Sequence, residues 1–223
     1  MFSREYILEK ILIIPAILVA FTVHEYAHAK IADKLGDKTP RFQGRLTLNP
    51  INHIDPIGFI MILILGFGWA KPVETNPRAF KNYYKDDLKV SIAGPISNLL
   101  AALIFVLIYG FIANHIFIGD FGRKVNTIMF LILYILRGVV EINVLLFLFN
   151  LLPIPGLDGF HVLKDLFHKF FYKFSDVIYG YQMVILVLFI VPLPGLRISI
   201  ASLIIGFPYR AIVSFFFKIA SFI

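Results

Sequence analysis

Long apolar stretches are the feature that most limits what this chain can fold into. Crossing the hydrocarbon core of a bilayer as an α-helix takes roughly 20 consecutive, mainly apolar residues. Four stretches approach or exceed that length, at about 7–32, 90–113, 127–152 and 198–217. Because lipid offers the backbone no hydrogen bonds, such stretches must be helical when they lie in a membrane. The sequence therefore predicts an all-α, polytopic membrane protein.

Two further apolar stretches are shorter. Residues 56–70, "PIGFIMILILGFGWA", predict a short helix, a membrane-associated hairpin or a re-entrant segment, because they are short for a full span. Residues 177–191, "VIYGYQMVILVLFIV", are a further candidate span. The expected fold is a bundle of about five to six transmembrane helices in a single domain, residues 1–223. Its core covers about 7–172, and a C-terminal helical pair covers about 177–217.

The composition and the charge pattern agree with this fold. Hydrophobic residues make up 59% of the chain, and the formal net charge is +7. In a membrane protein a basic excess marks cytoplasmic loops rather than nucleic-acid binding. Lys and Arg are frequent between the stretches at 7–32 and 90–113, whereas the loop before the stretch at 127–152 carries only Arg123 and Lys124. We therefore expect a multi-pass protein of the cell membrane without a nucleic-acid partner.

A short motif, "HEYAH", lies at the end of the first apolar stretch. His24 and His28 are four residues apart, so on a helix they share one face and both imidazoles can reach one Zn²⁺. Glu25 lies about 100° around the helix, beside the metal, where it can hold and deprotonate a metal-bound water. Surface histidines are the alternative for so short a pattern. Because ionisable groups next to lipid are usually functional, the position favours a metal site.

The third ligand must come from elsewhere in the chain, since a catalytic zinc takes three protein ligands and a water. With no cysteine present, only histidine and carboxylate side chains can supply it. The candidates are Asp158, His161, His53, Asp55, Glu141 and His115. Asp158 follows two prolines that end the apolar stretch at 127–152, which places it at the same end of the bundle as His28. The residues alone leave open whether Asp158 binds the metal or caps the next helix.

Three other polar features are open to more than one interpretation. Asn150, near a helix end, could donate to a developing oxyanion or form an interhelical hydrogen bond. His53 and Asp55 could orient the site, bind a second ion or close a proline-rich turn. Arg137 and Glu141, four apart in an apolar stretch, predict an ion pair that faces the bundle, with a proton or ion relay as the alternative.

Three motifs in order resemble the site-2 protease family of intramembrane zinc metalloproteases. They are "HEYAH" in the first hydrophobic stretch, "AGPISN" at the start of a later one and "NLLPIPGLDG" at the end of the next. The resemblance extends over about residues 20–160. Two further stretches, "LNPINHIDPIG" and "GWAKPVETNPRAF", are similar to the short prokaryotic branch of that family, without a PDZ-like or nucleotide-sensing domain.

The resemblance implies a site and an activity. It implies that His24, His28 and Asp158 bind one zinc per chain, that Glu25 is the base, and that Asn150 positions the substrate carbonyl. It also implies that the 40–75 region forms a membrane-associated hairpin or loop beside the substrate path.

The expected function is zinc-dependent endopeptidase cleavage in or near transmembrane segments of other proteins. The expected partners are such substrates and the lipid bilayer, with the active site nearer the cytoplasm. A metal or ion transporter and an inactive relative that binds membrane helices are the alternatives.

Overall fold

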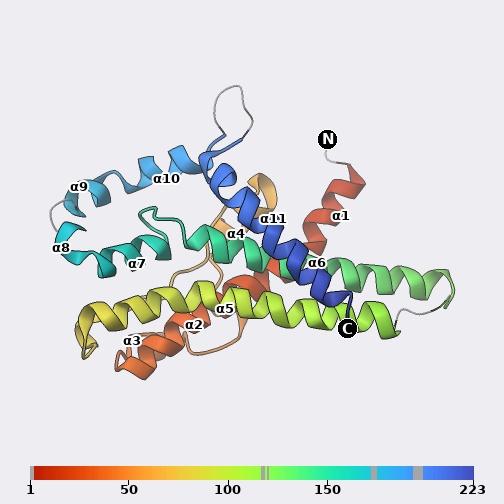
Figure 1. Ribbon diagram of the computed structural model, residues 1–223, viewed down its shortest axis with the longest axis horizontal. Helices are drawn as coiled ribbons and strands as arrows, with labels where there is room; N and C mark the ends of the chain where they lie inside the picture. The colour runs from red at the N-terminus through yellow and green to blue at the C-terminus, as the bar shows by residue number, and fades with distance from the viewer. Residues whose placement is uncertain (1–2, 117–118, 120, 172–174, 193–197) are drawn as a thin grey trace.

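The computed structural model describes residues 3–116, 119, 121–171, 175–192 and 198–223 (Figure 1). Its elements in the first half of the chain are α1 (Arg4–Leu12), α2 (Ile14–Leu35), α3 (Thr39–Phe42), η1 (Pro50–Asn52), α4 (Pro56–Leu65), η2 (Pro77–Ala79), α5 (Tyr83–Phe111) and η3 (Ile112–Ile116). The elements of the second half are α6 (Arg123–Asn150), α7 (Asp158–Leu166), α8 (His168–Phe171), α9 (Ser175–Gly180), α10 (Gln182–Ile190) and α11 (Ile200–Ala220). The predicted all-α class is thus confirmed for the described residues.

Four helical segments of the described residues are long and apolar enough to cross a membrane. They are Arg4–Leu35, which contains α1 and α2, then Tyr83–Ile116, Arg123–Asn150 and Ile200–Ala220. This supports a polytopic membrane protein, with four spans in place of the five to six expected. The stretch at 177–191 falls short because a turn at Tyr181 divides it into α9 and α10. Helix α4 has ten residues, about 15 Å of helix, which is half of a bilayer core.

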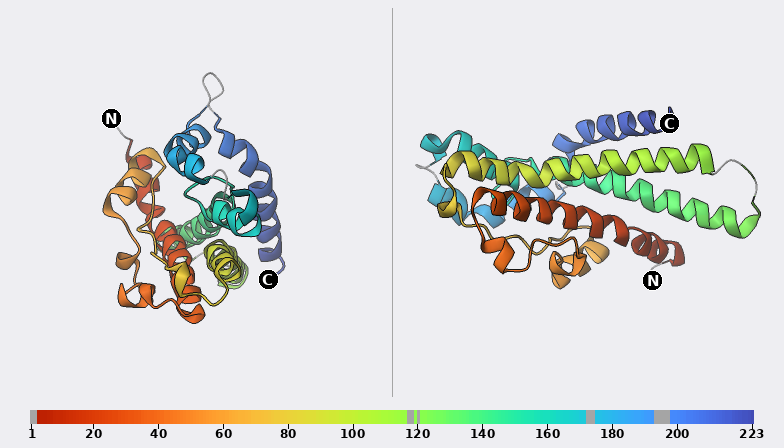
Figure 2. Two further views of the ribbon diagram at one scale, coloured as in Figure 1. Left: turned by 90° about the vertical axis from the view of Figure 1, so that its left-hand side faces the viewer. Right: turned by 90° about the horizontal axis from the view of Figure 1, so that it is seen from below.

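The long helices pack as one bundle. Helices α5 and α6 run side by side, α2 packs against both, and α11 crosses them on another side (Figures 1 and 2). Small and β-branched side chains fill the contact between α5 and α6, where Ala102, Val106, Val140 and Val144 are fully buried. Phe216 of α11 closes this cluster. Such small residues allow helices to approach closely in a membrane.

The chain between α2 and α5 lies along the side of α2 that faces away from α5 (Figure 2). Within it, the "GFGW" stretch folds back onto the start of α4. A Cβ on Gly68 would lie 2.0 Å from the Gly58 carbonyl oxygen, and a Cβ on Gly58 would lie 2.2 Å from the Trp69 carbonyl oxygen. Only glycine permits backbones to come this close. The predicted short helix is therefore followed by a tight return.

His53 and Asp55 close the turn before α4. The His53 Nε2 atom and the Thr47 carbonyl oxygen are 2.7 Å apart, and the Asp55 carboxylate accepts a 2.8 Å hydrogen bond from the Gly58 amide. Asp55 is thus the N-cap of α4. Of the three interpretations left open for these residues, the contacts favour the proline-rich turn.

Arg137 and Glu141 form the predicted ion pair, with 2.8 Å between the Arg137 Nε atom and a Glu141 carboxylate oxygen. The expectation that the pair faces the bundle was wrong, because the Arg137 side chain is 58% exposed. Its guanidinium lies 5.3 Å from the centroid of the Phe217 ring, at the margin between α6 and α11. The four-residue spacing fixes the pair, but it does not fix which side of α6 the pair occupies.

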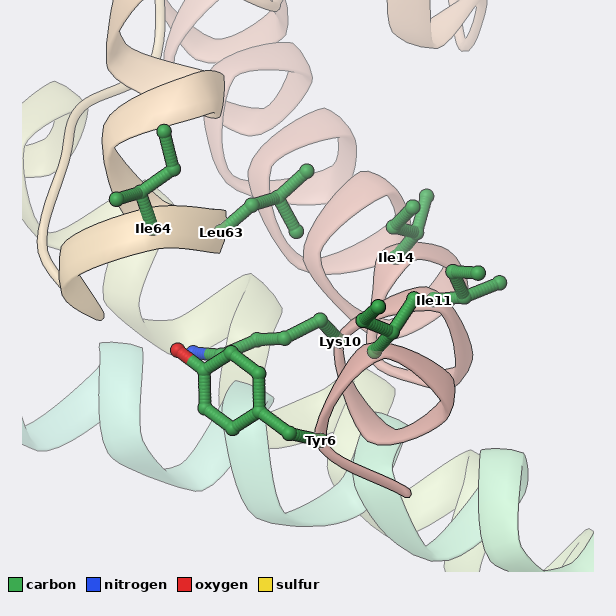
Figure 3. Close-up of a pocket in the computed structure, with 7 residues that line it drawn as sticks. Tyr6, Lys10, Ile11, Ile14, Leu63 and Ile64 are labelled. Atoms are coloured by element: carbon green, nitrogen blue, oxygen red, sulfur yellow. The ribbon is translucent and has the colours of Figure 1, made fainter. Parts of the chain in front are cut away.

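An apolar groove lies between α1 and α4, away from the polar motifs. Its volume is about 200 Å³. Figure 3 shows Tyr6, Lys10 and Ile11 on one side and Leu63 and Ile64 on the other. The side chains that line it leave no group for metal or acid–base chemistry except the amine of Lys10 and the phenol of Tyr6. The groove therefore contains none of the motif residues.

Candidate metal centre

Three potential ligands converge from two helices. The Nε2 atoms of His24 and His28 on α2 are 3.0 Å apart. They lie 3.1 Å and 3.4 Å from Oδ2 of Asp158, the first residue of α7. Four ligands arranged tetrahedrally at 2.0–2.1 Å from a zinc are about 3.3 Å from one another. The three atoms thus have the mutual spacing of ligands to one ion.

Asp158 is the only one of the six candidates for the third ligand that joins this group among the described residues. The alternative that it caps α7 does not hold, because Leu157 is the N-cap residue and no side chain forms a cap hydrogen bond there. Asp158 Oδ2 is buried and has no hydrogen-bond partner. This unpartnered carboxylate oxygen is directed at the two imidazoles.

A chain of buried amides orients His24. Its Nδ1 atom donates to Asn98 Oδ1 on α5 over 2.7 Å. The Asn98 amide in turn donates to the Ala20 carbonyl and to Asn143 Oδ1 on α6. Asn98 and Asn143 are both fully buried. With its proton on Nδ1, the His24 ring presents the lone pair of Nε2 to the metal position, as second-shell partners of histidine ligands do.

His28 is oriented by the backbone of α5. Its Nδ1 atom donates to the Val90 carbonyl over 2.7 Å, so its Nε2 atom also presents a lone pair. Gly94, one turn further along α5, lies directly over both rings. A Cβ added at Gly94 would lie 2.3 Å from His28 Nε2 and 2.7 Å from His24 Nε2. The glycine of "AGPISN" therefore leaves space for a metal ion and its ligands.

Replacing Gly94 with alanine is expected to remove the metal without unfolding the bundle. The new methyl group would occupy the space next to both Nε2 atoms and force the rings apart. We expect zinc content to fall below one tenth of that of the wild type, measured by elemental analysis of purified protein. Gly138→Ala is the matched control, because its methyl group would make an ordinary 3.7 Å contact with Ala16. Equal zinc in both variants would contradict this view of Gly94.

Glu25 lies beside the two histidines and contacts a different segment of the chain. While they contact α5, Glu25 Oε2 accepts a 2.8 Å hydrogen bond from the amide of Val73, in the chain between α4 and α5. Glu25 is 8% exposed. The roughly 100° between successive residues of a helix thus places the ligands on one side of α2 and the carboxylate next to them. The contact with Val73 was not predicted from the sequence.

An ion-pair cluster docks α7, and with it Asp158, on α5. Lys164 Nζ lies 3.3 Å from a carboxylate oxygen of Asp87 and 3.7 Å from one of Asp165. Burial, together with the adjacent negative charge of Asp87, raises the pKa of Asp165 to about 7. His161 lies beside this cluster, with 3.4 Å between its Nδ1 and Lys164 Nζ. His161 therefore belongs to the docking of α7 and lies outside the ligand group.

Asn150 lies at the C-terminal end of α6, before the turn that leads to Asp158. Its side-chain amide donates to the Leu146 carbonyl of its own helix over 3.1 Å. This is neither the oxyanion contact nor the interhelical hydrogen bond considered from the sequence. The side chain is half-buried and remains close in sequence to the metal group.

The donor set fits zinc. Two neutral imidazoles and one carboxylate are ligands that catalytic zinc sites use, with a fourth position left for water. The orphaned carboxylate oxygen of Asp158 and the space above Gly94 both fit an ion at this point.

Comparisons with known proteins agree with this chemistry. The sequence pattern of Peptidase family M50 matches residues 12–191. The proposed zinc metalloprotease YwhC of Bacillus subtilis is 46% identical over 152 residues, which cover 67% of this chain and 66% of that protein. The proposed zinc metalloprotease Rip2 of Mycolicibacterium smegmatis is 33% identical over 164 residues, 69% of this chain and 56% of Rip2.

A third relative is more distant in sequence. The proposed zinc metalloprotease MJ0611 of Methanocaldococcus jannaschii is 29% identical over 152 residues, covering 65% of this chain and 64% of that protein. The chain thus spans between about half and two thirds of the length of these relatives. No solved structure matches the chain. The names of the relatives and the donor set together indicate zinc as the metal.

Proposed function

The chain belongs to Peptidase family M50, and we propose that it is an intramembrane zinc endopeptidase, which hydrolyses peptide bonds in or near transmembrane segments of other membrane proteins. The observation that carries this proposal is the convergence of His24, His28 and Asp158 inside a bundle of membrane-spanning helices, with Glu25 beside them. A group buried in that position is reached by membrane-embedded substrates rather than by soluble ones.

Each residue has a separate task in the proposed reaction. His24, His28 and Asp158 hold one zinc, and bound zinc supplies a Lewis acid that polarises a carbonyl and makes water more acidic. Glu25 is the general base, which accepts a proton from the attacking water and passes it to the leaving amine. The Val73 amide holds the Glu25 carboxylate in place. Because transmembrane helices hide their carbonyls in hydrogen bonds, the substrate must unwind locally before it reaches these groups.

Asn150 is proposed to position the substrate carbonyl, from its place eight residues before Asp158 at the end of α6. Its amide would exchange the Leu146 carbonyl for the substrate when the substrate binds. Asn150→Ala is expected to lower cleavage about 10²-fold, since one lost oxyanion donor costs about that much. Zinc content should stay unchanged. Unchanged cleavage, or loss of folding, would assign Asn150 to packing alone.

The metal centre is proposed to lie nearer the cytoplasmic face, because the loop after α2 is rich in Lys and Arg. His24 and His28 lie in the second half of the Arg4–Leu35 helical segment and Asp158 lies at the start of α7, so they share that side of the bundle. Tags that report only from the cytoplasm should report at Lys38 and Lys169, and tags that report from outside should do so near Gly119. The opposite labelling would contradict the orientation.

A reconstitution assay tests the proposed function against the transporter alternative. Purified protein in detergent should cleave a single-span reporter, lose cleavage to a chelator and regain it with added Zn²⁺. A transporter would leave the reporter intact and carry metal into proteoliposomes. The clustering of the polar groups at one end of the bundle favours the protease, because a transport path needs polar groups across the membrane.

A further inference from the structure

We infer that Arg45 is a positioning residue for Glu25, which it reaches through the backbone of an extended segment. This segment, residues 70–76, is called the strap below. Arg45 fixes the strap, and the Val73 amide of the strap fixes the Glu25 carboxylate. The inference rests on the proposed role of Glu25 as general base.

The strap has little secondary structure of its own to hold it in place. Its pairing with a neighbouring segment is one isolated antiparallel bridge between Ile54 and Ala70, with a hydrogen bond from the Lys71 amide to the His53 carbonyl. Pro72 offers no amide donor. A segment of this kind takes its position from side chains that bind its backbone. The Val73 amide follows directly after this weakly paired part.

Arg45 supplies that binding. The side chain is buried, with 4% of the residue exposed. Its Nη2 atom donates to the carbonyl oxygens of Lys71 (3.0 Å) and Pro72 (2.6 Å), and its Nη1 atom donates to the carbonyl of Asn52. One guanidinium thus ties the strap to the turn before α4, immediately before the residue that contacts Glu25.

Arg45 is itself held by its backbone, since its amide donates to the Pro40 carbonyl over 2.8 Å. The far end of the strap has a second anchor. Asp37, 1% exposed, accepts a 2.6 Å hydrogen bond from the Asn76 amide and a 2.9 Å hydrogen bond from the Thr39 amide. The strap is therefore fixed on both sides of Val73, and Arg45 is the anchor next to it.

The chemistry of arginine suits this task better than that of lysine. A guanidinium presents five N–H donors in a planar fork, so it can serve three carbonyls at once. A lysine ammonium is a point charge on a flexible stem and cannot reproduce that geometry. We therefore expect Arg45→Lys to keep the positive charge and to lose most of the positioning.

The consequence for the reaction is a change in rate rather than in metal binding. Arg45 contacts neither the histidines nor Asp158 in the described structure, so zinc should stay bound when it is replaced. A carboxylate released from Val73 is displaced from the attacking water, and a misplacement of about 1 Å can cost roughly 10²-fold in rate. We expect kcat to fall by about that factor in Arg45→Ala, with a smaller change in KM.

A double-mutant cycle tests whether Arg45 acts through Val73. Val73→Pro removes the amide that contacts Glu25 and leaves Arg45 intact. Each single variant should lose about 10²-fold in kcat, and the double variant should be no slower than the slower single variant, because both changes break one connection. Losses that multiply to about 10⁴-fold would overturn the inference. Where Arg45→Ala does not fold, Arg45→Lys takes its place in the cycle.

Gln43→Ala is the matched control, because Gln43 contacts a side chain of the strap and not its backbone. Gln43 binds the Glu74 side chain over 2.7 Å at the surface. Its replacement should leave kcat within about twofold of wild type, since exposed contacts contribute little. Added guanidinium should restore part of the kcat of Arg45→Ala by filling the vacated position, which a general loss of structure would not allow.

A distance measurement keeps this inference separate from the proposed function. The chain has no cysteine, so spin labels at Lys30→Cys on α2 and Lys71→Cys on the strap report one distance. We expect a narrow distribution in the labelled parent and in Gln43→Ala, and a broad or shifted one in Arg45→Ala. An unchanged distribution would overturn the inference. Wild-type protein that cleaves no reporter would overturn the proposed function, while the label distances would still decide whether Arg45 fixes the strap.

Discussion

Glu25→Gln is expected to abolish cleavage while zinc stays bound. Glutamine has the shape of glutamate, and its side-chain oxygen can still accept the hydrogen bond from the Val73 amide. It cannot accept a proton from water, so only the base is lost. General-base catalysis is typically worth 10²–10⁴-fold, and we expect a loss near 10⁴-fold, because Glu25 is the one base of the proposed reaction. Initial rates on a single-span reporter measure this loss.

The matched control for Glu25→Gln is Glu74→Gln. Glu74 is a carboxylate of the strap that lies at the surface, one residue beyond Val73. Its replacement should keep at least about half of the wild-type rate, as expected for an exposed substitution. Comparable rates for Glu25→Gln and the wild type, at equal zinc content, would show that Glu25 is not the base.

Asp158→Ala is expected to empty the metal site. The substitution removes a carboxylate oxygen that lies 3.1 Å from one imidazole nitrogen and 3.4 Å from the other. Outer-shell partners of metal ligands typically contribute 10–100-fold to affinity, so a direct ligand should contribute at least about 10²-fold. Zinc measured after dialysis against a weak chelator should fall from about one per chain to a small fraction. Cleavage should fall with it.

His161→Ala is the control for the Asp158 variant. His161 lies three residues further along α7 and contacts Lys164, outside the ligand group. Its zinc content should match that of the wild type. Retained zinc in Asp158→Ala together with lost zinc in His161→Ala would exchange their roles and refute the ligand set.

The grouping of the three proposed ligands was partly predictable from the sequence, because helix geometry alone brings two of them together. A four-residue spacing on a helix places His24 and His28 on one face whatever the rest of the chain does. Asp158 could not be assigned from spacing alone, because a helix cap was an equal alternative. The motif order decided it, and in the structure the side chain points to the imidazoles in place of the α7 backbone.

The contacts that orient the site could not be predicted. Val73 and Glu25 are 48 residues apart, and they meet through a backbone amide that any residue except proline would provide. The link from Asn98 to Asn143 likewise joins different helices through side chains that also suit ordinary packing. No spacing in the sequence signals such contacts, because they depend on how the segments fold against one another.

Helix lengths were likewise only partly predictable from the sequence. Apolar runs indicated the four long spans, whereas the run at 177–191 did not reveal its break at Tyr181. The spacing of Arg137 and Glu141 predicted their ion pair, and only the packing of α11 against α6 places it at an exposed margin.

Mass spectrometry of a cleaved reporter tests the central claim most directly. A single-span membrane protein is incubated with zinc-loaded wild type, with Glu25→Gln, and with wild type plus chelator, and the new chain ends are identified. We predict fragments from the wild type alone, with their new termini in or beside the transmembrane segment. Intact reporter in all three samples, or the same fragments in all three, would contradict the account of this chain as a zinc endopeptidase with Glu25 as its base.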